Sequence, residues 1–321
     1  MNVRLGDVPG LAAALTAAQT TGLLTALAER PGPAAELAER CAIDERAAAY
    51  VLEIFGAFDL LTCESGVYRA GHELSELAAR PSSLAQMDVE LWQHAPVFLR
   101  TAVPLYVMDA AAAEREDRYR DVVAELGKMF SRAATQLAER CDLAPRTILD
   151  FGCGSGVWSL ALAERLPNAR VTGLDFPAVI ERFRARAASL GLSDRVDTIA
   201  GDMHTVALPS GQWDLAIIAN VLRLETAATA QSLVARAVGA LRPGGSLLVV
   251  DALKTGTPAA RQSRAIYALH LALRTRSGRV HAAAEIARWM HDAGCGAPTE
   301  LVLDPELTAA GALGVLMARK E

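Results

Sequence analysis

The stretch from Thr147 to Asp175, TILDFGCGSGVWSLALAERLPNARVTGLD, constrains the fold of this chain more than any other. Its first apolar run ends at Asp150, a glycine-rich segment follows, and an apolar pattern with helical spacing continues directly from the glycines. A second apolar run then ends at Asp175. This order predicts a strand, a tight loop, a crossover helix and a second parallel strand, which together form a βαβ unit.

The glycines of this loop indicate a ligand. Gly152, Gly154 and Gly156 can adopt positive φ angles, and because they lack a Cβ they let a ligand approach the backbone at the helix N-terminus. The carboxylate of Asp175, at the end of the second strand, can accept hydrogen bonds from both hydroxyls of a ribose. The unit therefore predicts a cofactor that contains a nucleoside.

The spacing of the glycines narrows the choice of cofactor. Dinucleotide-binding loops read G-x-G-x-x-G, whereas here Val157 stands at the position of the third glycine and Gly156 comes one residue early. No lysine follows the loop, as a nucleoside triphosphate site of the P-loop type would require. The G-x-G-x-G loop with Asp150 before it resembles motif I of the S-adenosylmethionine-dependent methyltransferases. The alternative is a purely structural glycine turn in another α/β protein.

The composition suits a folded protein with a small-molecule partner. The chain has 321 residues, 52% hydrophobic and 21% charged, which is enough for two domains and a substantial core. A net charge of −5 disfavours a nucleic-acid partner held by phosphate neutralisation. The five cysteines include no C-x-x-C pair, so we expect reduced thiols in a cytoplasmic protein, with no disulfide framework and no metal site.

No apolar run reaches membrane-spanning length, so we expect no membrane partner. Residues 10–28 are apolar, but polar residues interrupt the run at Gln19 to Thr21 and the leucines recur at helical spacing. We interpret this segment as an amphipathic helix rather than a signal peptide.

Residues 1–110 are expected to form an N-terminal helical domain. Apolar spacing predicts helices over 9–30, 34–41 and 45–61, followed by a short hairpin over 62–70 that turns at Ser65-Gly66. Helices followed by a hairpin form a winged-helix arrangement.

Winged helices often bind DNA, so a transcriptional regulator is an alternative function of another class. Residues 34–75, however, contain three arginines, no lysine and eight acidic residues. A helix that enters the major groove needs cations directed at phosphates, and this region is acidic. We therefore expect the winged helix to serve dimer packing.

Residues 111–145 are expected to connect the two domains, and the pattern stays helical from 83 to about 142. Large side chains in this alanine-rich region are core candidates, and they are also candidates to line a substrate cleft. The residues expected to contact substrate are Trp92, His94, Met129, Phe130, Tyr267 and His270.

Residues 146–321 are expected to form the cofactor domain. After Asp175, further strands are predicted at 196–200, 214–218 and 246–250, with helices over 179–190, 229–241, 265–274 and 282–293 between or after them. Segments 301–303 and 312–317 are expected to close the chain as a hairpin. Such alternation predicts an α/β fold with a mostly parallel, doubly wound sheet and one antiparallel strand.

A second acid stands where a ligand is expected. Asp202 follows the strand over 196–200, and the carboxyl edge of a parallel sheet is where ligands bind. Asp202 could accept a hydrogen bond from an adenine amino group, with Met203 against the ring.

Together these motifs resemble the small-molecule O-methyltransferases related to the plant caffeate-type and bacterial polyketide-tailoring enzymes. The resemblance covers nearly the whole chain and rests on an ordered set: DFGCGSG (150–156), Asp175-Phe176-Pro177, Gly201-Asp202-Met203, LRPGG (241–245) and RTRSGRVHAAAEIARWMHDAGC (274–295). It implies a Rossmann-like methyltransferase domain, a homodimer and S-adenosylmethionine as cofactor. The cofactor-binding residues it implies are Asp150, Gly152, Gly154, Gly156, Asp175, Phe176, Asp202, Met203 and Asn220.

One departure from the family pattern concerns the catalytic base. Members of the family commonly carry a histidine base just after the fourth strand, and the matching position here is Arg223. Arginine stays protonated and cannot be that base. His270 and Glu225 are the other catalytic candidates, while His94 and His281 are further histidines that could reach the substrate.

The sequence therefore favours O-methylation of a small secondary-metabolite-like substrate, with proximity rather than a histidine base driving the transfer. We predict that Arg223 anchors an anionic group, the alternative being that it turns away into an ion pair with Glu225 or another acid. A C- or N-methyltransferase, or a relative that uses the cofactor without transferring methyl, remains an alternative enzyme function.

Overall fold

The computed structural model describes residues 4–80, 82–254, 258–304, 307 and 313–321. The chain divides into two compact units, Met1–Gln93 and His94–Glu321, and the division falls inside helix α6 (Ser82–Thr101). Residues 94–110 thus group with the second unit, whereas the predicted limit of the N-terminal domain was residue 110. The backbone gives the reason, because Leu105 N and Met108 N donate to the carbonyls of Leu273 and Arg274, 2.8 and 2.9 Å away.

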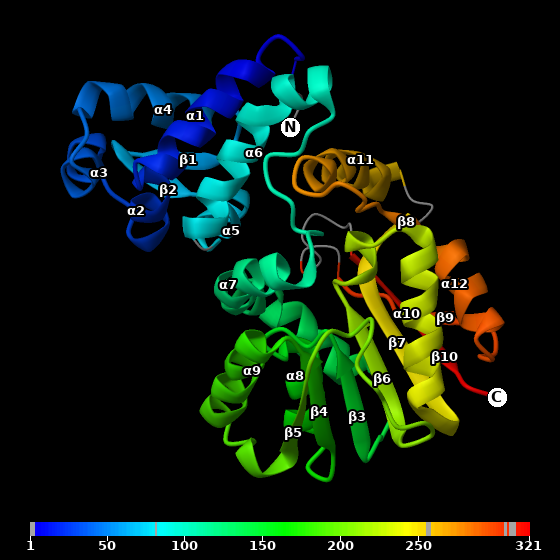
Figure 1. Ribbon diagram of the computed structural model, residues 1–321. Coiled ribbons are helices and arrows are strands. Elements are labelled where there is room, and N and C mark those ends of the chain that lie inside the picture. The colour runs from blue at the N-terminus through cyan, green and yellow to red at the C-terminus, as the bar shows by residue number, and fades with distance from the viewer. Residues whose placement is uncertain (1–3, 81, 255–257, 305–306, 308–312) are drawn as a thin grey trace. The chain divides into compact units, whose positions relative to one another are not determined.

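The first unit consists of helices around one small hairpin (Figure 1). Its elements are α1 (Val8–Thr20), α2 (Leu23–Glu29), α3 (Ala34–Cys41), α4 (Glu45–Ala57), β1 (Leu61–Glu64), β2 (Val67–Ala70) and α5 (His72–Ala78). The predicted hairpin is confirmed, since β1 and β2 pair antiparallel and the turn residues Ser65 and Gly66 have φ angles of 51° and 81°. The predicted helix over 9–30 is instead two helices, because the chain turns at Gly22 with a φ of 80°.

The second unit is built on one sheet with the strand order β5-β4-β3-β6-β7-β10-β9, and β8 pairs with β7. The strands are β3 (Thr147–Phe151), β4 (Arg170–Asp175), β5 (Val196–Ala200), β6 (Trp213–Ala219), β7 (Leu241–Lys254), β8 (His281–Ala282), β9 (Thr299–Glu300) and β10 (Leu313–Arg319). Strands β3 to β7 are parallel, while β10 is antiparallel to both β7 and β9. The predicted α/β sheet with one antiparallel strand is confirmed.

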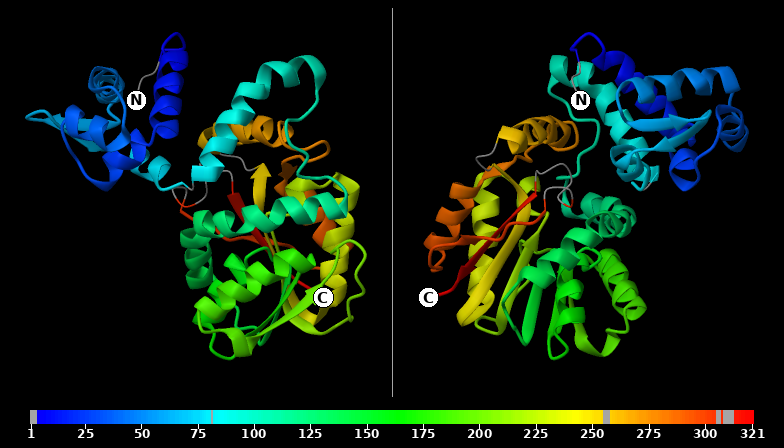
Figure 2. Two further views of the ribbon diagram at one scale, coloured as in Figure 1. Left: turned by 60° about the vertical axis from the view of Figure 1, so that its left-hand side comes forward. Right: turned by 180° about the vertical axis from the view of Figure 1, so that it is seen from behind.

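Helices cover both faces of this sheet (Figures 1 and 2). They are α7 (Ala112–Arg140), α8 (Val157–Arg165), α9 (Pro177–Ser189), α10 (Ala227–Ala240), α11 (Pro258–Ala272) and α12 (Ala283–Asp292), with the short 3-10 helices η1 (Ser193–Arg195) and η2 (Leu222–Leu224). Adjacent strand residues face opposite ways: Ile148 packs with α7, α8 and α9, whereas Leu149 packs with α10 and α12. Both faces of the sheet are therefore core, as a doubly wound fold requires.

Three sequence-based boundaries differ from the structure. The region over 83–142 is not one helical run, since residues 102–111 separate α6 from α7. Strand β7 begins at Leu241 and includes the predicted LRPGG turn, because Trp213 of β6 already pairs with Leu241. The strand that pairs with β10 in the closing hairpin is 299–300, and of the predicted segment 301–303 Leu301 N donates to the carbonyl of Val315 in β10 at 3.1 Å, while residue 312 lies outside the described residues.

Within the described part of the chain, no single helix is long and apolar enough to cross a membrane. The bent pair α1 and α2 passes the same test only when the two helices are taken together.

Candidate functional site

The glycine loop joins β3 to α8 in a conformation that side chains would oppose. Gly152, Gly154 and Gly156 have φ angles of 77°, 53° and 72°, and Gly156 is the N-cap of α8. A Cβ at Gly152 would lie 2.9 Å from Cγ2 of Val221, and one at Gly156 would lie 2.6 Å from Cδ2 of Phe183. The loop therefore needs glycine for its backbone and for its packing, and it presents bare backbone at the start of a helix.

The carboxylate of Asp175 is fixed against this loop. Its Oδ2 accepts a hydrogen bond from Gly154 N and its Oδ1 one from Phe176 N, both at 2.8 Å. Burial raises the pKa of Asp175 to about 6, an effect that the two backbone amides partly offset and the charge of Glu116 reinforces. Each oxygen keeps a lone pair, so the carboxylate can still accept hydrogen bonds from a ribose.

Asp150 lies beneath the loop rather than in it. Its side chain is 2% exposed and accepts a hydrogen bond from the hydroxyl of Ser159 in α8. Burial raises the pKa of Asp150 to about 7, the Ser159 hydrogen bond lowers it, and the charge of Asp175 raises it further. Asp150 thus joins the end of β3 to the first turns of α8, and its part in cofactor binding stays a prediction.

The other predicted cofactor residues follow neighbouring strands at the same edge of the sheet. Asp202 Oδ1 accepts a hydrogen bond from His204 N at 2.9 Å, which shapes the turn after β5. Met203 Sδ lies 3.3 Å from the position of a Cβ on Gly152. Asn220, after β6, has a φ of 62° and donates its backbone N–H to the carbonyl of Val250 at 2.7 Å. The ends of β3, β5 and β6 thus meet at the glycine loop, as the ligand sites of such sheets do.

Helix α7 covers the loop at close range. A Cβ on Gly127 would lie 2.4 Å from Oγ of Ser155, and one on Gly154 would lie 3.5 Å from Cγ1 of Val123. Nearer its start, α7 carries Glu116, whose Oε1 accepts a hydrogen bond from Ala178 N at the beginning of α9. One helix therefore contacts both the glycine loop and the segment that follows Asp175.

Arg223 is buried, 7% exposed, and hydrogen-bonded within the sheet edge. Its NH1 donates to Oδ1 of Asn220 at 2.6 Å and lies 3.5 Å from Oδ1 of Asp251, whose Oδ2 accepts from Arg223 N at 3.1 Å. Its Nε has no hydrogen-bond partner among the described residues. The ion pair forms with Asp251 and not with Glu225, which instead accepts from NH1 of Arg115 at 2.7 Å.

The surroundings of Arg223 keep it charged. Burial alone would lower its pKa, but the charges of Tyr267, Asp251 and Tyr119 raise it overall. Its guanidinium carbon lies 5.6 Å from the centroid of the Tyr267 ring, and that of Arg274 lies at the same distance from the same ring. The structure agrees with the sequence that Arg223 cannot accept a proton.

Glu225 belongs to a small ionic cluster that the sequence did not reveal. His204 Nε2 lies 3.3 Å from Oε1 of Glu225 and 3.3 Å from NH1 of Arg115. Burial would raise the pKa of Glu225, but the contacts with His204 and Arg115 outweigh it and hold the pKa below its usual value. The cluster joins the start of α7 to the turns after β5 and β6. His204 and Glu225 lie 89 and 110 residues after Arg115 in the chain, so no local sequence pattern could predict these contacts.

The other histidines differ in their surroundings. His281 is 1% exposed, and its Nε2 lies 2.9 Å from the carbonyl of Leu222, while burial lowers its pKa. His94 is half-buried, with Nε2 2.9 Å from the carbonyl of Val103. His270 is half-buried in α11, its ring 6.2 Å from that of Tyr267. Of these, only His270 is shown beside the aromatic ring that Arg223 contacts.

The residues predicted to line the substrate cleft fall into different places. Phe130 is 4% exposed and packs in the core, its ring 5.8 Å from that of Trp158, and Met129 packs against the same core. Trp92 belongs to the first unit and His94 to the second. Tyr267 is the member of this set that contacts Arg223, so it stays the leading candidate for a substrate contact.

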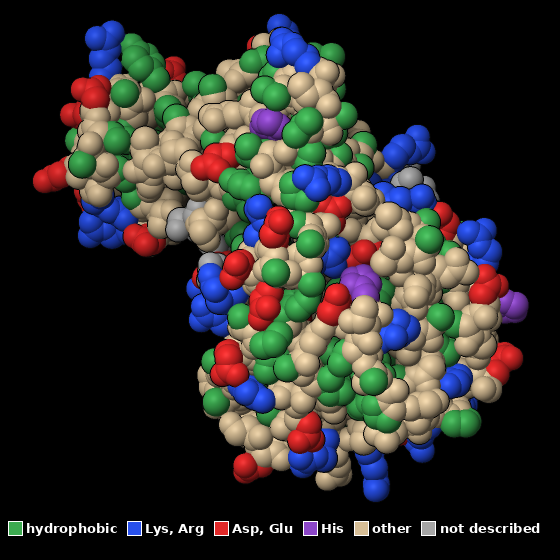
Figure 3. Space-filling view, viewed as in Figure 1, with side chains coloured by type: hydrophobic (Ala, Val, Ile, Leu, Met, Phe, Trp, Pro, Cys, Tyr) green, Lys and Arg blue, Asp and Glu red, His purple; other side chains and the backbone are tan. Residues whose placement is uncertain are grey.

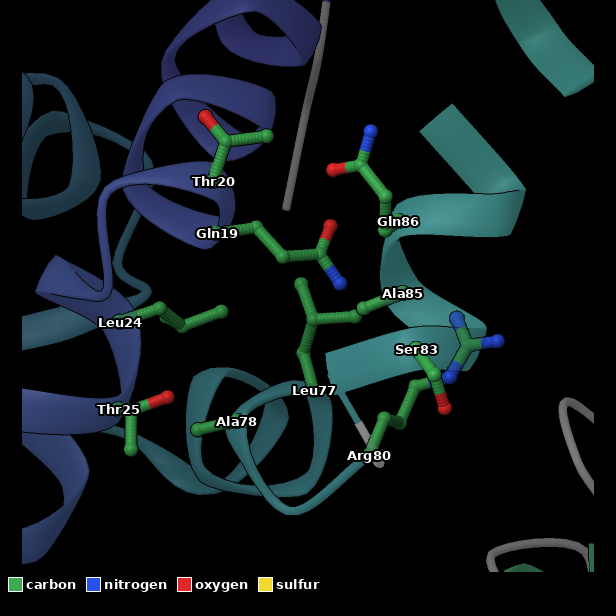
Figure 4. A pocket seen from close by; sticks show the side chains of 10 residues that line it. All are labelled: Gln19, Thr20, Leu24, Thr25, Leu77, Ala78, Arg80, Ser83, Ala85 and Gln86. Atoms are coloured by element: carbon green, nitrogen blue, oxygen red, sulfur yellow. The ribbon is translucent and has the colours of Figure 1, made fainter. Parts of the chain in front are cut away.

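One pocket lies wholly within the first unit, away from the glycine loop in sequence. Its volume is about 350 Å³, and side chains from α1, α2, α5 and α6 line it, with Gln19 and Gln86 on facing helices (Figure 4). Its cation, Arg80, forms an ion pair with Asp88. The residues predicted to bind a nucleoside cofactor lie at the edge of the sheet where β3, β5 and β6 end, and not in this pocket.

Comparison with known proteins places the geometry among methyltransferases. Residues 93–296 match the family model of the O-methyltransferase domain. The 3-hydroxy-5-methyl-1-naphthoate 3-O-methyltransferase of Streptomyces sahachiroi is 30% identical over 294 residues, 88% of this chain and 85% of that protein. The tetracenomycin polyketide synthesis 8-O-methyl transferase TcmO of Streptomyces glaucescens is 27% identical over 93% of this chain and 92% of its own.

Solved structures share the fold. Human N-acetylserotonin methyltransferase in complex with S-adenosylmethionine has a TM-score of 0.75 at 20% identity, over 98% of this chain and 96% of that one. CalO1, a methyltransferase in calicheamicin biosynthesis solved with S-adenosylhomocysteine bound, has a TM-score of 0.76 at 20% identity, with the same shares covered.

Proposed function

Because the chain belongs to the O-methyltransferase family and is an S-adenosylmethionine-dependent methyltransferase, we propose that it methylates a hydroxyl oxygen on a small aromatic secondary metabolite. The observation that supports this most is the glycine loop with Asp175 fixed against it, at the edge where β3, β5 and β6 end. Relatives named for naphthoate and polyketide O-methylation support the substrate class.

The residues present suit the cofactor. The bare backbone of the glycine loop would hold the amino-acid part, the carboxylate of Asp175 would accept hydrogen bonds from the ribose, and Met203 and Asp202 would contact the adenine. When bound, S-adenosylmethionine supplies a methyl group on a positively charged sulfur, which is already electrophilic.

The protein therefore has mainly to position the acceptor oxygen in line with that methyl group. We propose that Arg223, fixed by Asn220 and Asp251, directs its remaining donor capacity to an anionic oxygen of the substrate. An acceptor that is already ionised needs no base on the protein, which suits an arginine at the position where relatives commonly carry histidine.

The first unit has the element order of a winged helix, and we propose that it serves a homodimer rather than DNA. Acidic and basic side chains are interspersed in the view of Figure 3, and residues 34–75 carry more acidic than basic side chains. A cytoplasmic location is proposed on the five free cysteines.

The direct test uses the purified full chain with methyl-labelled S-adenosylmethionine and a panel of hydroxylated naphthalenes and polyketide aromatics. We expect label in a methoxy group, identified by its carbon chemical shift. Label attached to carbon or nitrogen would instead identify a C- or N-methyltransferase. Absence of transfer to every compound of the panel would count against the proposed substrate class.

A further inference from the structure

Three arginines surround one tyrosine in the second unit. Tyr119 on α7 lies within electrostatic range of Arg274, Arg223 and Arg115, whose charges all favour its ionised form. Burial outweighs those charges and raises the pKa of Tyr119 to about 12, so its phenol stays protonated. A protonated phenol can donate a hydrogen bond.

The charges in this cluster do not balance. Arg115 pairs with Glu225 at 2.7 Å, and Arg223 lies 3.5 Å from Asp251. Arg274 has no carboxylate partner among the described residues, and its hydrogen bond, from NH2 at 2.9 Å, is to the hydroxyl of Tyr267. Of the three arginines, Arg274 is thus the one without an ion pair in the described part of the chain.

Some donor capacity in the cluster is also unused. The Nε atoms of Arg115, Arg223 and Arg274 are each buried and have no hydrogen-bond partner among the described residues. Buried donors in proteins are nearly always satisfied, and an unsatisfied one costs free energy. Two of these atoms belong to Arg223 and Arg274, whose guanidinium carbons both lie 5.6 Å from the centroid of the Tyr267 ring, so the unused donors indicate a missing acceptor beside that ring.

The cluster is held in place before any ligand arrives. The carbonyl of Arg274 accepts from Met108 N at 2.9 Å, and the carboxylate of Asp109 accepts from the backbone N–H groups of Arg276 and Ser277 at 2.8 and 2.6 Å. The carboxylate of Asp109 makes these backbone hydrogen bonds and forms no ion pair with Arg274 among the described residues. A site fixed in this way loses little conformational entropy on binding.

The position of the cluster identifies where its ligand must belong. Arg223 follows Asn220 by three residues at the end of β6, and Asp251 lies in the neighbouring strand β7. This is the edge of the sheet where the glycine loop lies, and where the methyl acceptor must lie beside the cofactor. An anionic group of the acceptor molecule can therefore reach the cluster.

We propose that the methyl acceptor carries a carboxylate, bound by Arg274 and Arg223 with Tyr119 as a further donor, and that this group sets the substrate specificity of the site. A planar carboxylate matches the paired donors of a guanidinium, and the guanidinium carbons of Arg223 and Arg274 both lie 5.6 Å from the centroid of the Tyr267 ring, so the two cations share one neighbour. This inference rests on the proposed function only in taking the anion to be part of the methyl acceptor.

The test compares two probes that differ in the charge of one planar group, 2-naphthoate and 2-naphthamide. Their binding to the full chain is measured by calorimetry without cofactor, so that the result does not depend on the glycine loop. We expect the carboxylate to bind at least about tenfold more tightly than the amide, the size of a charge-assisted contact. Equal affinities, or no binding of either probe at millimolar concentration, would overturn the proposal.

The variant Arg274→Gln assigns the effect to its residue. It should remove most of the preference for the carboxylate while leaving the affinity for the amide within about twofold, and Arg274→Lys should keep part of the preference. Arg276→Gln is the matched control, because Arg276 is exposed two residues away, and it should keep the full preference. A full preference in a folded Arg274→Gln variant would also overturn the assignment. Cofactor binding is measured in a separate titration. Its absence would contradict the proposed function, whereas the comparison of the two probes would still hold.

Discussion

At the scale of single residues, burial rather than residue type decides what the charged groups of the site can do. Asp175 and Asp150 are carboxyls whose pKa values burial raises to about 6 and about 7, and both lie beside the glycine loop. Arg223 and Glu225 keep their charges because each has an opposite charge beside it. Ligand binding at this edge is therefore coupled to protonation.

The coupling predicts that cofactor affinity depends on pH through Asp175. Ribose hydroxyls donate to the ionised carboxylate, so binding lowers its pKa, and below pH 6 binding must release a proton. We expect the affinity for S-adenosylhomocysteine to rise between pH 5 and pH 7, by at most about tenfold per pH unit for one proton, and to level off above. Calorimetric titrations between pH 5 and pH 7 measure this change in affinity. Asp175→Asn should flatten the dependence, and an unchanged slope in that variant would assign the proton to another group.

Substitution of Arg223 tests whether it anchors an anion. Arg223→Ala leaves Asp251 buried without its partner, which should lower the free energy of unfolding by about 3–5 kcal/mol. On the true substrate, anchoring predicts that Lys retains more activity than Ala, that binding and rate fall together, and that Arg223→His gives no rescue at neutral pH. Thermal unfolding and steady-state kinetics measure the two effects. Parent-like activity in Ala would remove Arg223 from the chemistry, and a His variant better than the parent would identify a lost base.

At the scale of elements, α7 is the helix that packs on the glycine loop. Gly127 lets it approach Ser155 of the glycine loop, Val123 lies against Gly154, and Glu116 accepts the hydrogen bond from the start of α9. Because a rigid helix makes all three contacts, a change at one position should be transmitted to the loop.

Two helical glycines provide a matched test of this packing. A Cβ at Gly127 would lie 2.4 Å from Ser155 Oγ, whereas one at Gly239 in α10 would meet nothing within 4 Å. Gly127→Ala should destabilise the protein by about 1–3 kcal/mol and weaken cofactor binding, since the loop must shift. Gly239→Ala should stabilise it by roughly 0.5–1 kcal/mol and leave binding unchanged. Chemical denaturation and calorimetry compare the pair. Cofactor affinity unaffected by Gly127→Ala would mean that α7 does not support the loop.

The sequence could predict the elements whose signals are local. The glycine loop, the strand end at Asp175, the strand before Asp202 and the turn at Ser65-Gly66 each depend on a few adjacent residues, and the structure has them at those positions. The prediction misses the break at residues 102–111, although Pro104 is a local signal against a helix there, and backbone pairing with residues 273 and 274 fixes this segment. The sequence could not predict the contacts of Arg115 with Glu225 and His204, or of Arg274 with Tyr267, because tertiary folding alone brings these side chains together.

At the scale of the whole molecule, some apolar side chains remain exposed in the described part of the chain. Leu99 is 79% exposed and Val103 58%, and both belong to residues 1 to about 110. Exposed apolar side chains are candidates to be covered by an interface. This supports the proposed homodimer through residues 1 to about 110.

Light scattering at micromolar concentration should therefore give twice the mass of the chain. Leu99→Glu should shift the protein toward monomer if Leu99 is covered by a second copy, because an interface does not tolerate an unpaired buried charge. Val302→Glu serves as control, since Val302 is 69% exposed and lies outside the proposed interface. A parent protein that is monomeric at micromolar concentration would contradict the proposed homodimer. Salt-sensitive binding to duplex DNA would support the alternative function as a transcriptional regulator.

The most direct test of the central claim is a calorimetric titration of the parent chain and its Asp175→Ala variant with S-adenosylhomocysteine and with a nicotinamide dinucleotide. The account predicts a dissociation constant in the micromolar range for S-adenosylhomocysteine and no binding of the dinucleotide. It also predicts that Asp175→Ala weakens binding by about 1.5–3 kcal/mol, the contribution of hydrogen bonds to a charged acceptor. Preference for the dinucleotide, or an affinity for S-adenosylhomocysteine that Asp175→Ala leaves unchanged, would contradict it.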